Sequence, residues 1–327
     1  MSRLKCLVIG LDGASWRVLD SLIEKGILPN IKKLKKEGFF GKSKSCYPPV
    51  TCPNWKCYST GKNPGQLGVF WFEKINFKDK KINIIESSCF SDPEIWDYLG
   101  NVGYKVGVIN MPTNYPPKKI NGYMISGGPD ARETRYIKID RGFVYPRDYE
   151  IEIKKKFNYK VHPDPLITSK NPSKDEVQEI YKLIDSRFQV AKDLIDKGID
   201  FLHVTQFYIN IITHFMWDAQ AVEIAWKRID KNIGELMGQS DYVVLMSDHG
   251  AYKVDYEFNI NVWLNENGYL YYKKDFTDLF FKVGLTKHSL LSIAKKLHLV
   301  NILYKIVPEK IQNFFPTDMG VRKERKA

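Results

Sequence analysis

The sequence predicts a three-layer α/β/α sandwich on a mostly parallel central sheet, with an inserted cap region. Apolar runs at 5–11, 104–111, 200–207 and 241–246 are typical of buried strands. Segments with apolar residues at helical spacing lie between them, and the longest covers 174–197. Alternating strands and helices favour an α/β fold, and a chain of 327 residues that is 43% hydrophobic can bury its core.

The first part of the chain predicts a series of short elements. Apolar stripes predict helices over 14–25 and over 29–38, where a proline at the start suits a first helical turn. A short strand is expected over 39–45. Alternating aromatic and polar residues over 65–90 predict an irregular hairpin, and residues 95–101 are expected to form the end of a helix.

The segment around Thr51 combines turn and helix signals. Two prolines hold residues 47–50 extended and Pro53 suits a first helical turn, so Thr51 is expected at a strand-to-helix junction. A hydroxyl there faces the open backbone N–H groups of the helix start, which attract a phosphate or sulfate. Gly61 then ends a helix of about two turns. Taken alone, the segment is better explained as an ordinary turn threonine beside a proline.

Polar residues at the ends of two predicted strands favour the functional interpretation. The strand at 5–11 is followed by Asp12, and the strand at 241–246 by Asp248 and His249. In open α/β sheets, ligands bind beyond the carboxyl ends of the strands. We therefore expect these three side chains to converge on the helix start that carries Thr51, which is the chemistry of a metal-activated nucleophile.

The stretch 112–173 breaks the pattern and divides the chain. It is rich in Pro, Tyr, Arg and Lys with little helical period, so it is predicted to be a cap that contacts substrate. Residues 1–111 and 174–272 would form the core, and 273–327 a basic helical C-terminal region. Four arginines of the cap either meet a substrate anion or are solvated surface: Arg132, Arg135, Arg141 and Arg147.

The second half of the chain contains a predicted strand with a histidine, a predicted helix and a basic C-terminal stretch. His203 lies in the middle of a predicted strand, so we expect a core histidine with satisfied hydrogen bonds rather than a ligand. A helix is expected over 217–237. Over 279–315, apolar residues at helical spacing alternate with lysines, which predicts either peripheral contact with an anionic membrane surface or packing on the main domain.

Composition restricts the partners. The net charge of +12 favours anionic partners, but helix-turn-helix, zinc-finger and RNP-type patterns are missing, so specific nucleic-acid binding is not expected. No signal peptide and no stretch of about 18 apolar residues is found, so we expect a cytoplasmic protein, membrane-associated only if its C-terminal helices lie on a bilayer. The five cysteines are expected to be reduced structural thiols, with a zinc site at Cys46, Cys52 and Cys57 as the alternative.

Five motifs in one order resemble those of a known family. The chain is similar to the alkaline phosphatase superfamily, in its type I phosphodiesterase and nucleotide pyrophosphatase branch, and within that branch to the prokaryotic phosphohydrolase group. The motifs are Leu11-Asp12-Gly13, the Thr51 segment with Thr60-Gly61 and Asn63-Pro64-Gly65, His214-Phe-Met-Trp217, Ser247-Asp248-His249-Gly250 and Ile260-Asn-Val-Trp-Leu264.

The resemblance implies two divalent ions, usually zinc, that clamp an in-line phosphoryl transfer. One would be held by Asp12, Asp248 and His249 together with the nucleophile Thr51. These oxygen and nitrogen ligands suit a zinc-like ion, and manganese is the other candidate.

The second ion is where the sequence departs from the pattern. The family has Asp-x-x-x-His and a later histidine, whereas this chain has Asn210 in the acidic position, followed by His214. An amide brings no charge, so the site loses affinity. The later histidine has no counterpart in a predicted strand, and His288 and His298 are poor substitutes.

The resemblance therefore implies one function and one alternative. The first is a metal-dependent phosphodiesterase or phosphohydrolase that acts on an unidentified small phosphate ester, with one or two ions and a phosphothreonine intermediate at Thr51. The alternative is a catalytically impaired relative that binds a phosphorylated ligand, or a phosphotransferase. Asn210 and the absent late histidine favour the alternative.

Overall fold

The computed structural model of the chain describes residues 3–76, 81–127, 142–163, 172–217, 219–256 and 258–271, and the single positions 283, 285, 289, 290, 293 and 294. The chain divides into two compact units, Met1–Lys253 and Val254–Ala327. The first unit contains the sheet. In the second, helix α10 (Ile260–Glu266) is described, and the predicted helices of 279–315 lie almost wholly outside the described residues.

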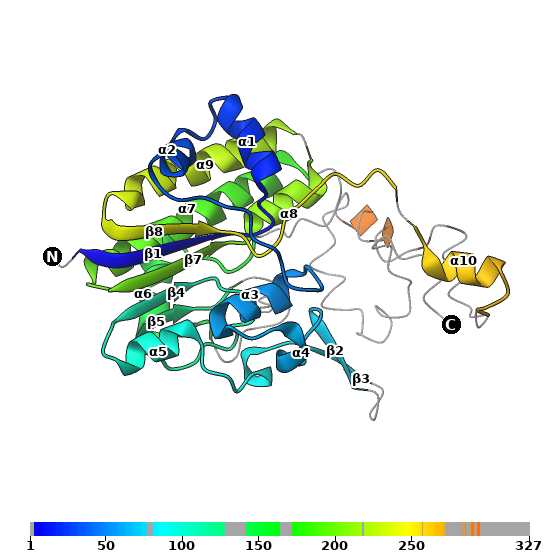
Figure 1. Cartoon of the computed structure of the whole chain (residues 1–327), viewed down its shortest axis with the longest axis horizontal. Coiled ribbons are helices and arrows are strands. Elements are labelled where there is room, and N and C mark those ends of the chain that lie inside the picture. Colours follow the sequence, from blue (N-terminus) through cyan, green and yellow to red (C-terminus); the bar gives the residue numbers. More distant parts are fainter. Residues whose placement is uncertain are drawn as a thin grey trace. The chain divides into compact units, whose positions relative to one another are not determined.

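A six-stranded sheet forms the centre of the first unit, with the strand order β6-β5-β4-β7-β1-β8 (Figure 1). All neighbouring strands are parallel except β5 and β6, so the predicted mostly parallel sheet is confirmed. The strands are β1 (Leu4–Leu11), β4 (Val106–Ile109), β5 (Gly122–Ile125), β6 (Val144–Tyr145), β7 (Phe201–Gln206) and β8 (Ser240–Met246).

Helices cover both faces of this sheet, which confirms the three layers. One face packs against α1 (Trp16–Glu24), α2 (Pro29–Glu37), α6 (Arg147–Phe157), α7 (Lys174–Asp196), α8 (Tyr208–Phe215) and α9 (Gln220–Met237). The other packs against α3 (Thr51–Thr60) and α5 (Ile95–Asn101). Side chains alternate between the two cores along each strand, with Ile9 in the larger and Val8 in the smaller.

The smaller elements differ in part from the prediction. The hairpin predicted over 65–90 is present as β2 (Glu73–Asn76) and β3 (Lys81–Ile84), after the short helix α4 (Pro64–Leu67) and before a 3-10 turn (Ser87–Cys89). The strand predicted over 39–45 is wrong, because this stretch pairs with no strand and Phe39 is completely exposed. Apolar residues alone do not form a strand where no neighbouring strand is placed to form backbone hydrogen bonds with them.

Part of the predicted cap belongs to the sheet and its helical layer. Strands β5 and β6 extend the sheet beyond β4, and the expectation of little helical period is wrong for α6, an eleven-residue helix that buries Tyr149 and Ile153 one turn apart. The rest of the cap prediction concerns mainly 128–141 and 164–171, which lie outside the described residues.

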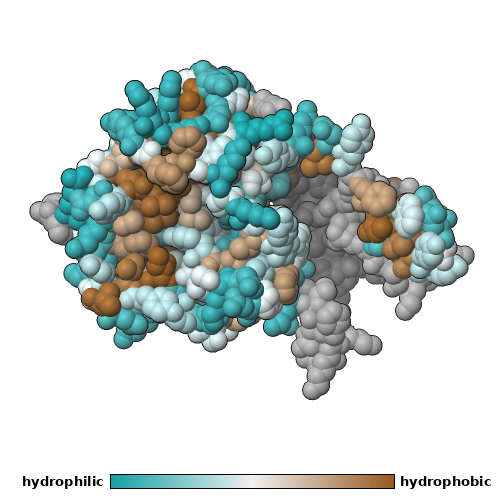
Figure 2. All heavy atoms as spheres, viewed as in Figure 1, coloured by the Kyte–Doolittle hydropathy of each residue, from teal (hydrophilic) through white to brown (hydrophobic). Residues whose placement is uncertain are grey.

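The surface mixes charge with apolar patches. Figure 2 shows hydrophobic residues gathered between hydrophilic ones on the face that it draws. The edge strand β8 contributes to the exposed apolar surface, with Val244 43% exposed. Among the described residues, no helix has the length and apolar composition needed to cross a membrane.

Candidate active site

Thr51 starts helix α3, and a tightly bonded loop leads into it. Val50 is extended (φ −127°, ψ 140°) and Thr51 is the first helical residue, so the predicted helix start is confirmed, but a loop and not a strand leads into it. The Asn54 side chain closes the loop: its Oδ1 accepts the Cys46 N–H at 2.8 Å, and its amide donates to the carbonyl oxygens of Pro48 and Val50. A glycine in the left-handed conformation ends the helix, as expected. The Thr51 hydroxyl is thus held on a rigid, buried turn.

Two parallel strands bring the acids together at one edge of the sheet. Gly10 of β1 pairs with Met246 of β8. Two residues beyond this pair, the segments that leave the two strands reach Asp12 and Asp248. The Gly13 N–H donates to Asp248 Oδ1 at 3.3 Å and ties the two strand ends together. Both carboxyl groups are buried, with residue exposures of 1% and 6%.

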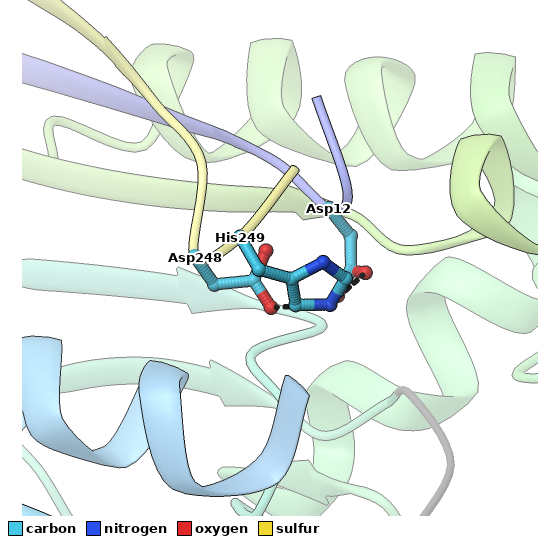
Figure 3. A group of neighbouring side chains, drawn as sticks. All are labelled: Asp12, Asp248 and His249. Carbon is cyan, nitrogen blue, oxygen red and sulfur yellow. Dashed lines mark ion pairs between the residues drawn. The ribbon is translucent and has the colours of Figure 1, made fainter. Parts of the chain in front are cut away.

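His249 completes a cluster with these acids (Figure 3). Its Nε2 lies 3.3 Å from Asp248 Oδ2 and 3.7 Å from Asp12 Oδ1. One ligand atom from each of the three residues lies within 4.8 Å of the others. The Thr51 Oγ1 lies 3.1 Å from His249 Nε2 and 3.5 Å from Asp12 Oδ1. The structure therefore brings together the four residues that the sequence predicted to meet.

Burial dominates the electrostatics of the two acids. Burial raises the pKa of Asp12 to about 6, against the lowering effects of the His249 charge and of hydrogen bonds from Trp55, Asn210 and Thr51. The pKa of Asp248 is raised well above its ordinary value, first by burial and then by the neighbouring Asp12 carboxylate. Two ionised carboxylates in this site would therefore be only partly stabilised by their hydrogen bonds and by His249, since both pKa values remain raised.

The cluster fits a divalent cation. The Asp248 Oδ2 atom is buried and has no hydrogen-bond partner, and such an atom is costly unless an ion or a donor satisfies it. Two carboxylates and an imidazole are donors that zinc accepts, and manganese shares the preference for carboxylate oxygens. Asp12, Asp248 and His249 can therefore hold one ion next to the Thr51 hydroxyl.

Asn210 and His214, predicted for a second ion, lie on α8 but differ in their placement. Asn210 is buried and its Nδ2 donates to Asp12 Oδ1 at 2.7 Å, so its amide nitrogen and not its oxygen faces the acids. His214 is exposed and is not a member of the three-residue cluster. Although the His214 residue as a whole is exposed, partial burial of its imidazole, and then the positive charge of His249, lower the pKa of His214. The second half of the site is therefore less complete than the first.

A glycine permits this close approach of α8. Gly13 has φ +71°, and a Cβ there would lie 2.6 Å from Asn210 Oδ1. Any other residue would both strain the backbone and push Asn210 away from Asp12. The glycine that follows the acid in the first motif thus serves the packing of the site.

The other predicted residues that the structure describes lie apart from the cluster. His203 is buried with its two ring nitrogens 3.2 Å from Tyr58 OH and 2.8 Å from Thr205 Oγ1. Burial lowers its pKa to about 3, so it is a neutral core histidine, as predicted. None of the five cysteines forms a disulfide. Arg147 lies on α6 and pairs with Glu150 at 2.9 Å; Arg132, Arg135, Arg141, His288 and His298 lie outside the described residues.

Sequence reasoning missed the contact between Trp55 and Asp12. The Trp55 indole Nε1–H donates to Asp12 Oδ2 at 2.8 Å, and its side chain is completely buried. A Cβ at Gly10 would lie 2.4 Å from the indole ring. A glycine inside a buried strand is a known sign of such a close approach, and Gly10 was the available signal.

Comparison with known proteins agrees with this architecture. The crystal structures of phosphonoacetate hydrolase from Sinorhizobium meliloti, in complex with phosphonoformate and with phosphonoacetate, both match with a TM-score of 0.57. Their sequence identities are 17% and 16%, and the match covers 81% and 82% of this chain but 62% of each neighbour. The likeness shows an alkaline phosphatase-like fold. Among curated protein sequences, no relative matches the chain.

A family comparison covers most of the sequence. Residues 6–314 match the type I phosphodiesterase / nucleotide pyrophosphatase family. This range includes the ends of β1 and β8, which carry Asp12, Asp248 and His249. It also includes α3 with Thr51 and α8 with Asn210, whose side chains contact Asp12. The chain belongs to the type I phosphodiesterase / nucleotide pyrophosphatase family, within the alkaline phosphatase superfamily.

Proposed function

We propose that this protein is a metal-dependent phosphoric ester hydrolase of the phosphodiesterase type, with Thr51 as its nucleophile. The observation that carries the proposal is the position of Thr51 Oγ1, 3.1 Å from His249 Nε2 and 3.5 Å from Asp12 Oδ1 at the start of α3. A buried hydroxyl beside two acids and an imidazole is the arrangement of an activated nucleophile. Family membership supports the same reaction class.

Asp12, Asp248 and His249 would hold a divalent ion, zinc or manganese, beside this hydroxyl. When bound, such an ion lowers the pKa of a coordinated hydroxyl and offsets charge on the transferred phosphoryl group. The buried, unpartnered Asp248 Oδ2 supports this assignment, as does the raised pKa that burial gives to Asp12.

The residues of the chain then divide the work of a two-step transfer. The Thr51 hydroxyl loses its proton and forms an Oγ–P bond while the bond from phosphorus to the leaving alcohol breaks. The backbone N–H of Thr51, the first residue of α3, can donate to a phosphoryl oxygen at this helix start. A water oxygen then bonds to phosphorus while the Oγ–P bond breaks, which releases the phosphate product, and a proton from that water restores the Thr51 hydroxyl. We propose a small phosphate ester as substrate, and the net charge of +12 favours an anion.

A second function is favoured by one specific observation. Asn210 offers its amide nitrogen to Asp12, and His214 is exposed, so a second ion would find a weak site. Without that ion the second step slows. The protein would then act as a phosphotransferase, or bind a phosphorylated ligand without turnover.

The test is a panel of phosphate monoesters and diesters, with phosphonoacetate included, assayed with zinc and with manganese. Thr51→Ala should lower kcat by about a thousandfold or more, since the covalent step is lost. Thr60→Ala is the matched control, because it removes a threonine hydroxyl from the other end of the same helix, where it donates to the Lys56 carbonyl oxygen and accepts the Lys62 N–H.

Three outcomes separate the functions. Turnover that depends on metal and on Thr51 supports the hydrolase. Turnover that survives Thr51→Ala unchanged removes Thr51 from the mechanism. Saturable binding of a phosphate ester without turnover, in wild type and Thr51→Ala alike, supports the binding protein.

A further inference from the structure

We propose that Trp55 is a positioning residue, whose indole N–H fixes the Asp12 carboxylate so that Oδ1 faces the metal ligands and the nucleophile. The inference rests on the proposed function, since it assigns a task to a side chain that supports the same site. Trp55 is the fifth residue of α3, on the helix that also carries Thr51. One rigid helix thus supplies both the hydroxyl and the group that orients its neighbouring acid.

The two oxygens of Asp12 have separate partners. Oδ2 accepts the Trp55 indole N–H at 2.8 Å. Oδ1 accepts the Asn210 Nδ2–H at 2.7 Å and is the atom near Thr51 Oγ1 and His249 Nε2, at 3.5 Å and 3.7 Å. A carboxylate with one oxygen fixed cannot rotate freely about its Cβ–Cγ bond, so the other oxygen keeps its place. Asp12 is therefore prepared to offer one oxygen, not two, to an ion.

Trp55 itself is held from three sides. Its ring lies edge-on to Tyr58, with centroids 6.1 Å apart, and edge-on to His203 at 5.9 Å. The His203 nitrogens are in turn bonded to Tyr58 and Thr205. On the third side the ring lies against Gly10, where no Cβ could be accommodated. The indole has no room to turn away, so the position of its N–H is set by the packed core.

The same core contains a second tryptophan in an equivalent bond, which makes a matched control. Trp96 is also completely buried, packs in the same cluster and donates its Nε1–H to Glu94 Oε2 at 3.1 Å. Glu94 is paired with lysines and lies outside the metal cluster. Replacing either tryptophan by phenylalanine removes one N–H bond to a buried carboxylate, but only one of these carboxylates belongs to the candidate site.

The first experiment measures zinc affinity, by competition with a chromophoric chelator, for wild type, Trp55→Phe and Trp96→Phe. We expect Trp55→Phe to bind about 10- to 100-fold more weakly, the loss typical of groups that orient metal ligands. We expect Trp96→Phe to remain within about threefold of wild type, although both variants lose thermal stability. Equal zinc affinities for the two variants would overturn the proposal.

The second experiment follows the wild-type chain, labelled with ¹⁵N at its seven tryptophans. The Trp55 indole N–H signal, assigned by its loss in Trp55→Phe or by elimination with the other six substitutions, should shift when zinc is added. The Trp96 signal should not. A Trp55 signal that ignores zinc, while zinc binding is shown by the chelator, would contradict the proposal.

These readouts also separate this inference from the proposed function. Zinc affinity and the indole signal report on Asp12 whether or not any ester is hydrolysed. If Thr51→Ala loses turnover while both tryptophan variants bind zinc equally well, the proposed hydrolase function stands and the role of Trp55 is rejected. If Trp55→Phe alone loses zinc affinity while Thr51→Ala keeps its turnover, the role of Trp55 stands and the proposed nucleophile is rejected.

Discussion

The buried acid Glu94 and the buried pair Asp12 and Asp248 are stabilised in opposite ways. Glu94 is paired with Lys56 Nζ at 2.7 Å and with Lys118 Nζ at 2.9 Å. Burial alone would raise the pKa of Glu94, but the charges of the two lysines outweigh it and hold that pKa below the ordinary value. Among the described residues no lysine or arginine pairs with Asp12 or Asp248, whose charged neighbour is the His249 ring, and burial raises both of their pKa values.

The difference shows how a structural acid can be told from a functional one. Both groups are equally hidden from water, and each receives an indole N–H. In the Glu94 network the protein supplies its own positive charge, so nothing further is needed. In the Asp12 cluster the charge must come from outside, which is the condition for binding a cation. Predictions that separate the two groups therefore test the assignment of the site.

The largest effect is expected from Lys56→Met, which leaves Glu94 without its nearest cation. Breaking a buried ion pair in this way costs about 3–5 kcal/mol of unfolding free energy. Urea unfolding measures it, and the double variant Lys56→Met with Glu94→Gln should recover part of the loss, because the stranded charge is gone. A loss below about 1 kcal/mol would mean that Lys56 is not the compensating group.

The second prediction has the opposite sign. In metal-free protein, Asp248→Asn should raise the unfolding free energy by about 1 kcal/mol or more, because it removes the repulsion between two carboxylates. It should also abolish the stabilisation that zinc gives to wild type. Thermal melts with EDTA and with zinc measure both effects.

The control for that variant is Asp230→Asn. Asp230 is also buried, but both of its oxygens accept backbone N–H groups, from Asn30 at 3.1 Å and from Ile31 at 2.8 Å, whereas Asp248 Oδ2 accepts no hydrogen bond. The same substitution there places an amide against donors and should destabilise the protein. Destabilisation of similar size at both positions would contradict the view that Asp248 is strained without a cation.

The sequence predicted the first half of the site because strand ends are easy to locate. Buried strands appear as apolar runs, and parallel strands place the residues that follow them at one edge of the sheet. The acids after β1 and β8 therefore had to lie near each other, and the prolines marked the start of the Thr51 helix. This logic needs only the order of elements, not the packing of side chains.

The remaining parts depend on side-chain packing between distant residues. The Trp55 bond to Asp12 spans 43 positions and the Lys56 bond to Glu94 spans 38. No periodicity reports such pairs. Likewise the sequence could show that Asn210 replaces an acid, but not that its amide nitrogen turns toward Asp12. Helix α6 was missed because most of it is exposed and only two of its residues are buried.

A smaller effect is expected from pH. Because burial raises the folded-state pKa of Asp12 to about 6, the folded metal-free protein holds more protons than the unfolded chain between about pH 4 and pH 6. Its unfolding free energy should therefore fall as pH rises through this window, by at most about 1.4 kcal/mol per pH unit for each extra proton. Glu94 acts in the opposite direction at lower pH, since its stabilisation is lost as pH falls through its lowered pKa.

Saturating zinc sharpens this test. A bound ion keeps the acids ionised, so the slope between pH 4 and 6 should disappear and zinc uptake should release protons. Urea unfolding at several pH values, with EDTA or with zinc, measures the slopes. Identical slopes in the two conditions would show that the titrating groups are not the metal ligands.

The smallest effect is expected from Asn210→Asp, the change that restores an acid beside His214. In metal-free protein it replaces an N–H bond to Asp12 by a third carboxylate, so the fold should become less stable. With saturating zinc the same carboxylate adds charge for a second ion, and turnover should rise by about twofold to tenfold. Asn210→Ala is the control, because it removes the N–H bond without adding charge. Turnover of Asn210→Asp no faster than wild type, at unchanged zinc content, would show that α8 does not contribute a second ion site. The missing acid at position 210 would then not be what limits turnover.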